Sequence, residues 1–367
     1  MKTASMAGMA LLAQASLAPA LAQDTKPVPK KYYGVNLGGW LVLERWITPT
    51  LYDGVDAEDE YTFCQKLGKE KATARLQKHR ETWITADDFK WLAARGINSV
   101  RLPVGYAVLE ENAPYISARD TLEWAFKTAK ENGLSVLLDL HGVPGSQNGW
   151  DHSGRSGEIG WPKSQENYDH SLRIIEGLAE FCMGHDNLLG IELVNEPKKE
   201  VPLDFLQKYY RAAYAIVRKH IPEGQGSVVI HDGFRQTVWG DTLVEPDYKN
   251  VILDTHMYQC FGDEDKKRDI EEQVDFAVVH RKTQLDAMRE KHRCIVGEWS
   301  CGLPPHTTRA MKGLTQDAGM RAYAAAQLLS YDTTDGWYFW TYRTEASGGW
   351  NFRNCVERGW MPEKYNV

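Results

Sequence analysis

The sequence has no long hydrophobic run beyond residue 22. No later segment approaches the ~20 uncharged apolar residues that a membrane-spanning helix requires. The sequence also lacks a basic stripe, because acidic and basic residues are mixed along the chain and give a formal net charge of −7. Nucleic-acid-binding surfaces need clustered positive charge, so we expect no nucleic acid partner and no membrane span. A neutral polar ligand fits this charge balance better.

Metal-ligand spacing is absent as well. The six cysteines show neither paired CxxC spacing nor a neighbouring His cluster, so we expect no metal, no cofactor and no catalytic cysteine. In an exported chain they permit disulfides, but their spacing does not choose a pairing. They are Cys64, Cys182, Cys260, Cys294, Cys301 and Cys355.

The chain also lacks a Ser/Gly/Pro-rich linker and internal repeats, so we expect one domain and a monomer. At the N-terminus, an early lysine precedes a run of apolar and small residues that ends at Ala20-Leu21-Ala22. This pattern is typical of a secretory signal peptide. We therefore predict a signal peptide over residues 1–22, a catalytic domain over residues 23–367, and a secreted or cell-wall-associated protein.

Short apolar runs alternate with amphipathic segments from about residue 33 onward, which is the pattern of repeated βα units. Eight strands with helices between them predict a closed (β/α)8 TIM barrel of the α/β class. The expected strands are Tyr33–Leu37, Ser99–Leu102, Ser135–Leu140, Leu189–Asn195, Ser227–His231, Val251–His256, Cys294–Gly297 and Gly336–Tyr342. The later helices are expected at Gln165–Met183, Leu203–His220, Ile270–Lys291 and Asp317–Tyr331.

Local signals mark some helix boundaries. Thr85 to Asp88 resembles a capping box at a helix N-terminus, with Asp in place of the usual Glu. Gly96 and Gly133 stand where two helices are expected to end.

Polar residues follow the predicted strands at their C-terminal ends, which is where such barrels carry catalytic groups. Several polar side chains on one rim indicate a ligand site, because each must be hydrogen-bonded or solvated. They are Asn36, Arg101, His141, Asn195, Glu196, Asp232, His256, Tyr258, Glu298, Trp340 and Tyr342. The 13 Trp and 17 Tyr residues add possible sugar-stacking surfaces, although ordinary packing accounts for most of them.

Two carboxylates are predicted at the barrel mouth. Glu196 ends the fourth strand and Glu298 ends the seventh. Glycosidic cleavage with retention needs one carboxylic acid to protonate the leaving oxygen and one carboxylate, ~5 Å away, to attack the anomeric carbon. Glu192 lies four residues before Glu196 on the same face, and we expect it lower in the barrel as a structural, paired carboxylate.

The neighbours of the pair suggest how the roles divide. Arg101 near Glu298 would keep that carboxylate ionised, and Tyr258 would donate a hydrogen bond to it. Glu196, without such a partner, is expected to keep a higher pKa and to act as the acid.

A series of motifs from about residue 33 to residue 352 resembles the fungal-type exo-1,3-β-glucanases of glycoside hydrolase family 5, in the cellulase superfamily. The motifs occur in the order of that family. They include GVNLGGWLVLE (residues 34–44), DEY (59–61), WIT (83–85), VRLPVGY (100–106), DLHG (139–142), GSQNG (145–149), GIELVNEP (190–197), VIHD (229–232), HMYQ (256–259), GEWS (297–300) and GWYFW (336–340).

The resemblance implies roles for the matching positions. Glu196 corresponds to the acid/base, Glu298 to the nucleophile, and Asn195 to the residue that holds the sugar 2-hydroxyl. Arg101, His141, His256 and Tyr258 correspond to residues lining the subsite of the terminal sugar, the glycon. Glu44 would bind glycon hydroxyls, since a carboxylate accepts from two adjacent hydroxyls; the alternative is a surface Glu paired with Arg45 or another base.

The chain departs from the family pattern on the acceptor side of the site. The Phe pair that clamps the entrance corresponds to Trp150 and Phe261, and His152 replaces the usual Asn. The family's WxW at the last strand corresponds here to Trp340 and Tyr342, so the glycon floor is expected to differ. The segment between Ser300 and Thr315 is shorter than in many relatives, which leaves a more open cleft as an alternative to strict exo action.

The sequence therefore predicts a retaining exo-1,3-β-glucanase that releases glucose from non-reducing ends through a covalent glycosyl-enzyme. Within the same class, the alternatives are a 1,6-β-glucanase, a diglycosidase, a steryl or flavonoid β-glucosidase, or a transglycosylase. From another class, the alternative is a silent carbohydrate-binding barrel, which would be expected to lack Glu196 or Glu298.

Overall fold

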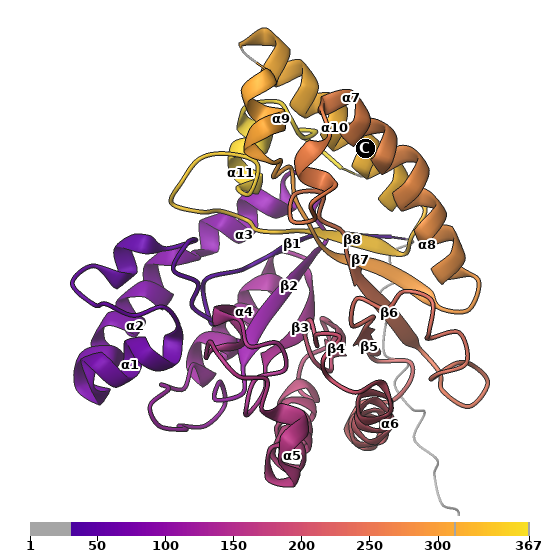
Figure 1. Ribbon diagram of the computed structural model, residues 1–367. Coiled ribbons are helices and arrows are strands. Elements are labelled where there is room, and N and C mark those ends of the chain that lie inside the picture. Colours follow the sequence, from indigo (N-terminus) through magenta and orange to yellow (C-terminus); the bar gives the residue numbers. More distant parts are fainter. Residues whose placement is uncertain (1–30, 312, 366–367) are drawn as a thin grey trace, which may run out of the picture. The chain divides into compact units, whose positions relative to one another are not determined.

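The computed structural model describes residues 31–311 and 313–365, which lie in one compact unit that begins at Lys31. Its centre is a closed barrel of eight parallel strands in the order β1 to β8, with helices around it (Figure 1). The predicted (β/α)8 barrel is confirmed. The predicted signal peptide, residues 1–22, lies outside the described residues. Among the residues that the structure describes, no helix is long and apolar enough to cross a membrane.

Each predicted strand is present, with ends that shift by a few residues. The strands are β1 Tyr32–Asn36, β2 Ser99–Gly105, β3 Ser135–Gly142, β4 Leu188–Glu192, β5 Ser227–His231, β6 Val251–His256, β7 Arg293–Trp299 and β8 Gly336–Phe339. The main helices are α1 Glu60–Leu67, α2 Lys69–Trp83, α3 Ala86–Ala93, α4 Arg119–Glu131, α5 Gln165–Cys182, α6 Leu203–His220, α7 Ile270–Asp275, α8 Lys282–Arg289, α9 Pro305–Ala310, α10 Leu314–Tyr331 and α11 Phe352–Glu357.

The strands are apolar on both faces because helices cover one face and the barrel interior covers the other. One side chain from most strands fills the lower interior, where a layer is formed by Tyr32, Leu137, Leu189, Val229, Ile252, Ile295 and Tyr338. Gly34 makes room for this layer, since a Cβ there would lie 2.2 Å from the Tyr338 ring. The interior is therefore filled with apolar side chains toward the N-terminal ends of the strands, and its polar groups lie nearer the C-terminal ends.

The helix boundary signals are confirmed. Thr85 and Asp88 form the predicted capping box of α3, with the Thr85 backbone N–H donating to Asp88 Oδ2 at 2.8 Å. Gly96 and Gly133 adopt φ angles of +79° and +73°, the left-handed conformation that ends helices.

The predicted single helix over Ile270–Lys291 is wrong in detail. A π-helical segment, Phe276–Arg281, separates α7 from α8. A π turn leaves backbone carbonyls without their usual helical partner, and the Ser330 hydroxyl from α10 donates to the carbonyl of Ala277 at 2.7 Å. Side-chain periodicity cannot reveal this tertiary contact.

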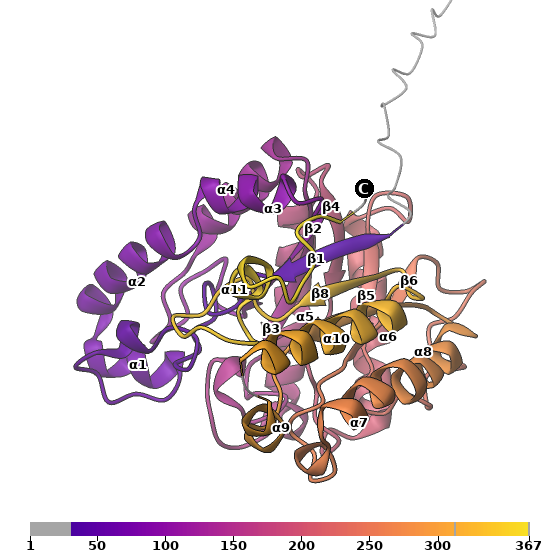
Figure 2. The same cartoon turned by 90° about the horizontal axis from the view of Figure 1, so that it is seen from above.

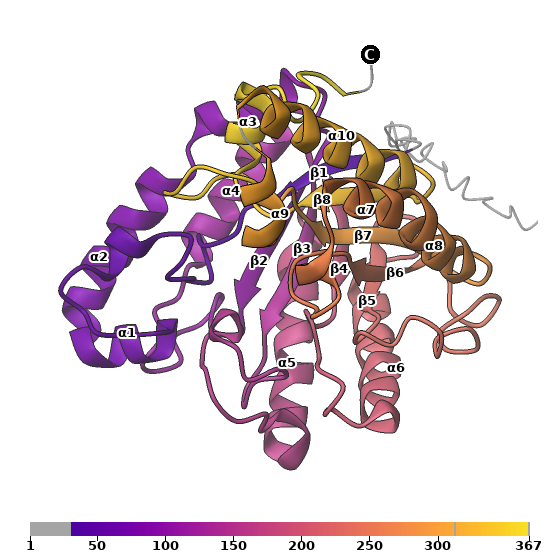
Figure 3. The ribbon, with the colours of Figure 1, turned by 45° about the horizontal axis from the view of Figure 1, so that its top comes forward.

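Helices α1 and α2 were not predicted, and Figure 2 shows them side by side, away from the strands. They enclose a satellite core formed by Leu43, Tyr52, Val55, Ala57, Phe63, Cys64, Ala72, Leu76 and Ile116. Helices α5 and α6 also lie side by side, on the outside of β4 and β5 (Figure 3).

Candidate active site

Glu196 and Glu298 lie together at the C-terminal ends of the strands. Glu298 is within β7, whereas β4 ends at Glu192 and Glu196 follows it in a turn at φ +44°. Nδ1 of His256, at the end of β6, lies 2.7 Å from Glu196 Oε1 and 3.3 Å from Glu298 Oε2. These two oxygens are thus separated by no more than the sum of the two contacts. The two carboxylates therefore lie close together, as the short spacing of ~5–5.5 Å in retaining glycosidases requires.

Arg101, in β2, is a fully buried hub of ion pairs. Its guanidinium lies 3.0 Å from Glu298, 2.8 Å from Glu192 and 3.1 Å from Asp139. It also donates to Asn195 Oδ1 at 2.7 Å. Burial alone would lower the pKa of Arg101, but these carboxylates hold it well above its usual range. The expected proximity of Arg101 to Glu298 and the structural pairing of Glu192 are confirmed.

Tyr258 donates from its hydroxyl to Glu298 Oε2 at 2.7 Å, as expected. Its own carbonyl accepts from Arg281 Nη2 at 2.6 Å, so the π-helical segment fixes the loop that carries Tyr258. The Asn36 amide donates to the carbonyl of Gly297 at 2.9 Å and accepts from Arg101 at 2.9 Å. The Gly297 carbonyl, beside Glu298, is therefore held by Asn36 of β1, which is itself held by Arg101 of β2.

The expectation that Glu196 has no partner is wrong. Burial alone would raise the pKa of Glu196, but the hydrogen bond and positive charge of His256 hold it well below its usual range. His256 is buried too, yet Glu298, Asp254 and Glu196 around it raise its pKa well above the ordinary value. For Glu298, Arg101 lowers the pKa as expected, but burial and the charge of Glu196 outweigh it and raise the pKa. These shifts favour a proton on His256 and an ionised Glu196.

The side chains predicted to line the glycon subsite form a second group near the Arg101 hub. His141 Nδ1 is 2.6 Å from Asp139 Oδ2, and its Nε2 lies 3.4 Å from the Asn195 amide nitrogen. The His141 ring stacks on Trp340, with ring centroids 5.5 Å apart and planes 7° apart. His141, Asn195 and Trp340 are thus brought together, as the site prediction requires.

Glu44 is buried, with 4% exposure, so the alternative of a surface Glu paired with Arg45 is wrong. Its Oε2 accepts from Trp46 Nε1 at 2.8 Å, whereas Arg45 donates to the Ala57 carbonyl. Burial and the nearby charge of Asp151 raise the pKa of Glu44 well above its usual range. Asp151 was missed by the sequence analysis, although it lies between Trp150 and His152 in the acceptor-side motif.

Tyr342 does not line the site, and its predicted role in substrate binding is wrong. Its ring is fully buried against Trp91, and its hydroxyl donates to Asp88 Oδ1 of α3 at 2.7 Å. Strand β8 ends at Phe339, so alternation along the strand does not extend from Trp340 to Tyr342.

The two predicted clamp residues have separate surroundings. Trp150 contacts Phe234 edge-on, with ring centroids 6.2 Å apart, and Lys198 Nζ lies 4.1 Å from the centroid of the Trp150 ring. Phe261 is 65% exposed and contacts Tyr258 and Trp350 at ring distances of 5.4 and 5.9 Å. Within residues 31–365, no ring contact joins Trp150 to Phe261. An open groove is lined by Trp150, Lys198, Lys199, Glu200 and Phe234.

Asp232, at the end of β5, has a structural role. Its carboxylate accepts from Thr255 Oγ1 and from the Phe234 backbone N–H, both at 2.7 Å. The neighbouring His231 lies edge-on to His256 at 4.4 Å. These contacts fix the turn in which Phe234 lies.

Two clusters have the ligand spacing of a metal site, and both share His256. One includes Glu196 and His231, and the other includes Glu192 and Asp254. Spacing along the sequence cannot predict clusters that different strands assemble. Glu196 is already paired with His256, and Glu192 with Arg101. We therefore assign these groups to the proton and charge network of the site.

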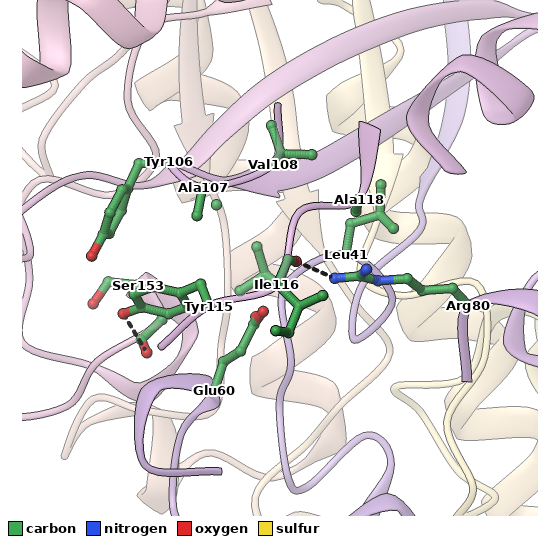
Figure 4. Close-up of a pocket in the computed structure, with 13 residues that line it drawn as sticks. Leu41, Glu60, Arg80, Tyr106, Ala107, Val108, Tyr115, Ile116, Ala118 and Ser153 are labelled. Carbon is green, nitrogen blue, oxygen red and sulfur yellow. Dashed lines mark hydrogen bonds between the residues drawn. The ribbon is translucent and has the colours of Figure 1, made fainter. Parts of the chain in front are cut away.

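A small enclosed cavity beside the N-terminal loop contains a further buried carboxyl, Glu60 (Figure 4). Glu60 Oε2 accepts from the Leu43 backbone N–H at 3.2 Å, next to Glu44. Burial raises the pKa of Glu60 to about 7, against the lowering influence of Arg80. Arg80 itself donates to the carbonyls of Ser117 and Ile116. The cavity thus supports the segment that carries Glu44.

The six cysteines are all present as free thiols in the structure. Five are buried, and only Cys260 is partly exposed.

Comparison with known proteins gives a consistent result. Residues 64–345 match the family model described as cellulase, glycosyl hydrolase family 5. A probable glucan 1,3-beta-glucosidase A of Emericella nidulans is 36% identical over 96% of this chain and 95% of its own length. A glucan 1,3-beta-glucosidase of Blumeria graminis is 36% identical over 91% of this chain and 87% of its length. Among solved structures, a rutinosidase from Aspergillus niger superposes with a TM-score of 0.77 at 22% identity, covering 90% of this chain and 97% of its own.

Proposed function

The chain belongs to glycosyl hydrolase family 5, and from that premise we propose that it is an exo-acting glucan 1,3-β-glucosidase that retains the anomeric configuration. The observation that carries this proposal is the pair of buried carboxylates, Glu196 and Glu298, that share one imidazole nitrogen of His256. The names of the two fungal relatives support the substrate.

In the first step, a Glu298 oxygen attacks C1 of the terminal glucose while the bond from C1 to the glycosidic oxygen breaks. Glu196 gives its proton to the leaving oxygen, and the product is a covalent glucosyl-enzyme plus a shortened glucan. Arg101 and Tyr258 hold the Glu298 carboxylate in place through contacts of 3.0 and 2.7 Å. In the second step, ionised Glu196 takes a proton from water, the water oxygen bonds to C1, and Glu298 leaves.

The proton needed for the first step is taken up on Oε2 of Glu196, because Oε1 already accepts from His256. Substrate binding removes water from the site, and desolvation raises the pKa of a carboxylate. The low pKa in the ligand-free site therefore favours the base form that the second step uses.

In this proposal, buried polar and aromatic side chains near the two carboxylates bind the terminal glucose. Glu44, with Asp151 nearby, offers acceptors for adjacent hydroxyls, and Asn195 offers an amide beside the nucleophile. His141 and Trp340 form a stacked wall. Buried acceptors of this kind favour a terminal sugar over an internal one, whose O3 carries another residue.

On the acceptor side, the open groove at Trp150 and Phe234 favours a second candidate, hydrolysis of other β-glucosides with large aglycones. A 1,6-β-glucan, a diglycoside or a flavonoid glucoside would leave through the same opening. An aromatic acceptor site also favours transglycosylation, in which a sugar hydroxyl replaces water in the second step.

We further propose that residues 1–22 are a signal peptide, that residues 23–367 form the catalytic domain, and that the protein is a secreted monomer. The composition of the N-terminal segment supports secretion.

A time course on laminarin tests the proposed function. Glucose is expected as the earliest product, and Glu298→Ala is expected to abolish its release. Long oligosaccharides without early glucose would contradict exo action, and unchanged turnover by Glu298→Ala would remove the nucleophile assignment. A panel of 1,3-glucans, 1,6-glucans and aryl glucosides separates the second candidate.

A further inference from the structure

His152 faces the oxygen of Glu196 that carries the catalytic proton. Its Nε2 lies 3.6 Å from Glu196 Oε2, while Glu196 Oε1 is occupied by His256 Nδ1 at 2.7 Å. The two oxygens of the carboxylate thus have different imidazoles beside them. A separation of 3.6 Å is longer than a hydrogen bond, but contacts of this kind shorten when substrate closes a catalytic site.

The position of His152 is fixed by its own loop. It lies in the 3-10 turn Asp151–Ser153, which follows β3. Ser153 Oγ is 2.7 Å from Ser146 Oγ and donates to the Trp150 carbonyl at 2.7 Å. The His152 ring also packs against Trp150, with centroids 5.3 Å apart. These contacts fix the turn that carries His152 and pack its ring against Trp150, beside Glu196.

His152 is neutral at ordinary pH. Burial lowers its pKa to about 4, and His141 and His256 act in the same direction against the charges of Glu196 and Asp139. A neutral imidazole has one N–H and one lone pair, so the tautomer decides what Glu196 Oε2 meets.

The burial of Nδ1 selects the tautomer. Nδ1 of His152 is buried without a hydrogen-bond partner. An unpaired buried N–H is rarer than an under-satisfied acceptor, so the proton belongs on Nε2. The Nε2–H group then points toward Glu196 Oε2 and stabilises the ionised carboxylate.

We propose that His152 is a positioning residue that donates from Nε2 to Glu196 Oε2 and so favours the base form of Glu196. This inference rests on the proposed roles of Glu196 and Glu298. It goes beyond them because it assigns a role to His152, which the proposed two-step mechanism does not use. Its effect is expected mainly in the second step, in which ionised Glu196 activates water.

The test compares His152→Leu, which removes the donor, with His152→Gln, whose amide places a donor near the position of Nε2. For each variant, kcat/KM on laminaritriose and kcat on 2,4-dinitrophenyl β-glucoside are measured against pH. The activated aryl leaving group needs little acid assistance, so its kcat reports the second step. Urea unfolding shows whether each variant is folded.

For His152→Leu, loss of the donor raises the pKa of Glu196. The acidic limb of the aryl kcat, which reports Glu196 in the glucosyl-enzyme, is expected to move upward by about 0.5–1 pH unit. His152→Gln is expected to stay close to the wild type. An acidic limb that does not move, or that moves downward, would overturn the proposal, as would a Gln variant that behaves like Leu.

A second measurement does not depend on the variants folding. In the wild-type protein, 15N NMR of imidazole-labelled His152 is expected to show the neutral Nε2–H tautomer, and the Nδ1–H tautomer would overturn the proposal. Failure of the proposed function is recognised separately, because the wild type itself would then release no glucose from laminaritriose.

Discussion

Nδ1 of His256 donates a 2.7 Å hydrogen bond to Oε1 of Glu196. The same nitrogen lies 3.3 Å from Glu298 Oε2, and Nε2 of the ring lies 3.5 Å from Asp254. One imidazole thus sets the charge of both candidate catalytic carboxylates. Because its pKa is raised and that of Glu196 is lowered, the pair contributes to stability over a defined pH range.

The first prediction concerns that range. The raised pKa of His256 stabilises the folded state. This contribution is complete below pH 6.5, the pKa of His in the unfolded chain, and it is lost as pH rises through the pKa of His256 in the folded state. A lowered Glu pKa contributes stability above the unfolded value of 4.5, and that part is lost as pH falls through the folded pKa. His256→Asn is therefore expected to lower the free energy of unfolding most between pH 4.5 and 6.5, by ~3 kcal/mol.

Urea unfolding of wild type and His256→Asn across the pH range measures this difference. The difference is expected to shrink well above pH 6.5. A difference that is constant with pH, or that grows toward alkaline pH, would show that the pair is not charged as described.

The second prediction concerns Arg101. Arg101→Met removes the cation that contacts Glu298, Glu192 and Asp139 together, and it leaves the buried Glu192 without its ion-pair partner. Loss of one partner of a buried ion pair typically costs ~3–5 kcal/mol. Arg101→Lys keeps the charge, but its single ammonium cannot reach every partner of the guanidinium. This variant is expected to be more stable than Arg101→Met, with a kcat/KM that is lower than that of the wild type by ~100-fold or more.

Thermal unfolding and kcat/KM of the two variants test this account. If Arg101→Met is as stable as wild type, the hub does not hold the carboxylates in the charged state.

The third prediction contrasts Glu44 with Tyr342. Glu44→Gln replaces a buried acceptor of sugar hydroxyls, and kcat/KM on laminaritriose is expected to fall by ~10–100-fold. Tyr342→Phe removes the hydrogen bond to Asp88 and leaves the ring in place. Activity is therefore expected to stay near wild type, while the free energy of unfolding falls by ~1 kcal/mol. A large loss of activity in Tyr342→Phe with an intact fold would restore Tyr342 to the site.

The fourth prediction concerns Glu60. Burial raises its pKa to about 7 from an unfolded value of 4.5, so the folded state binds this proton more tightly. The free energy of unfolding is then expected to fall as pH rises from 4.5 to 7, by up to ~3 kcal/mol. Glu60→Gln removes the titration and is expected to flatten this part of the profile relative to wild type. Parallel profiles for the two proteins would contradict the buried, neutral carboxyl.

Much of this barrel could be predicted from the sequence, for a physical reason. Parallel strands covered on both faces read as continuous apolar runs, and polar residues at their ends mark the rim. That rule placed Glu196 and Glu298 at the ends of the fourth and seventh strands, and it predicted that Glu192 is a buried, paired carboxylate. The structure shows that the partner of Glu192 is Arg101.

The errors fall where tertiary contacts decide the outcome. The hydrogen bond from His256 to Glu196 joins different strands, and nothing in the local sequence indicates it. Tyr342 was misplaced because β8 ends three residues before it. The π-helical segment accepts a hydrogen bond from Ser330 of another helix, and Asp151 is recognised only through its proximity to Glu44.

Retention of configuration is the central claim, since it follows from two carboxylates close enough to share His256 Nδ1. Proton NMR of the first glucose released from laminaritriose, recorded before mutarotation, tests it most directly. The account predicts that this glucose is the β-anomer. Initial release of the α-anomer would contradict the account, because it would require a water between the two carboxylates.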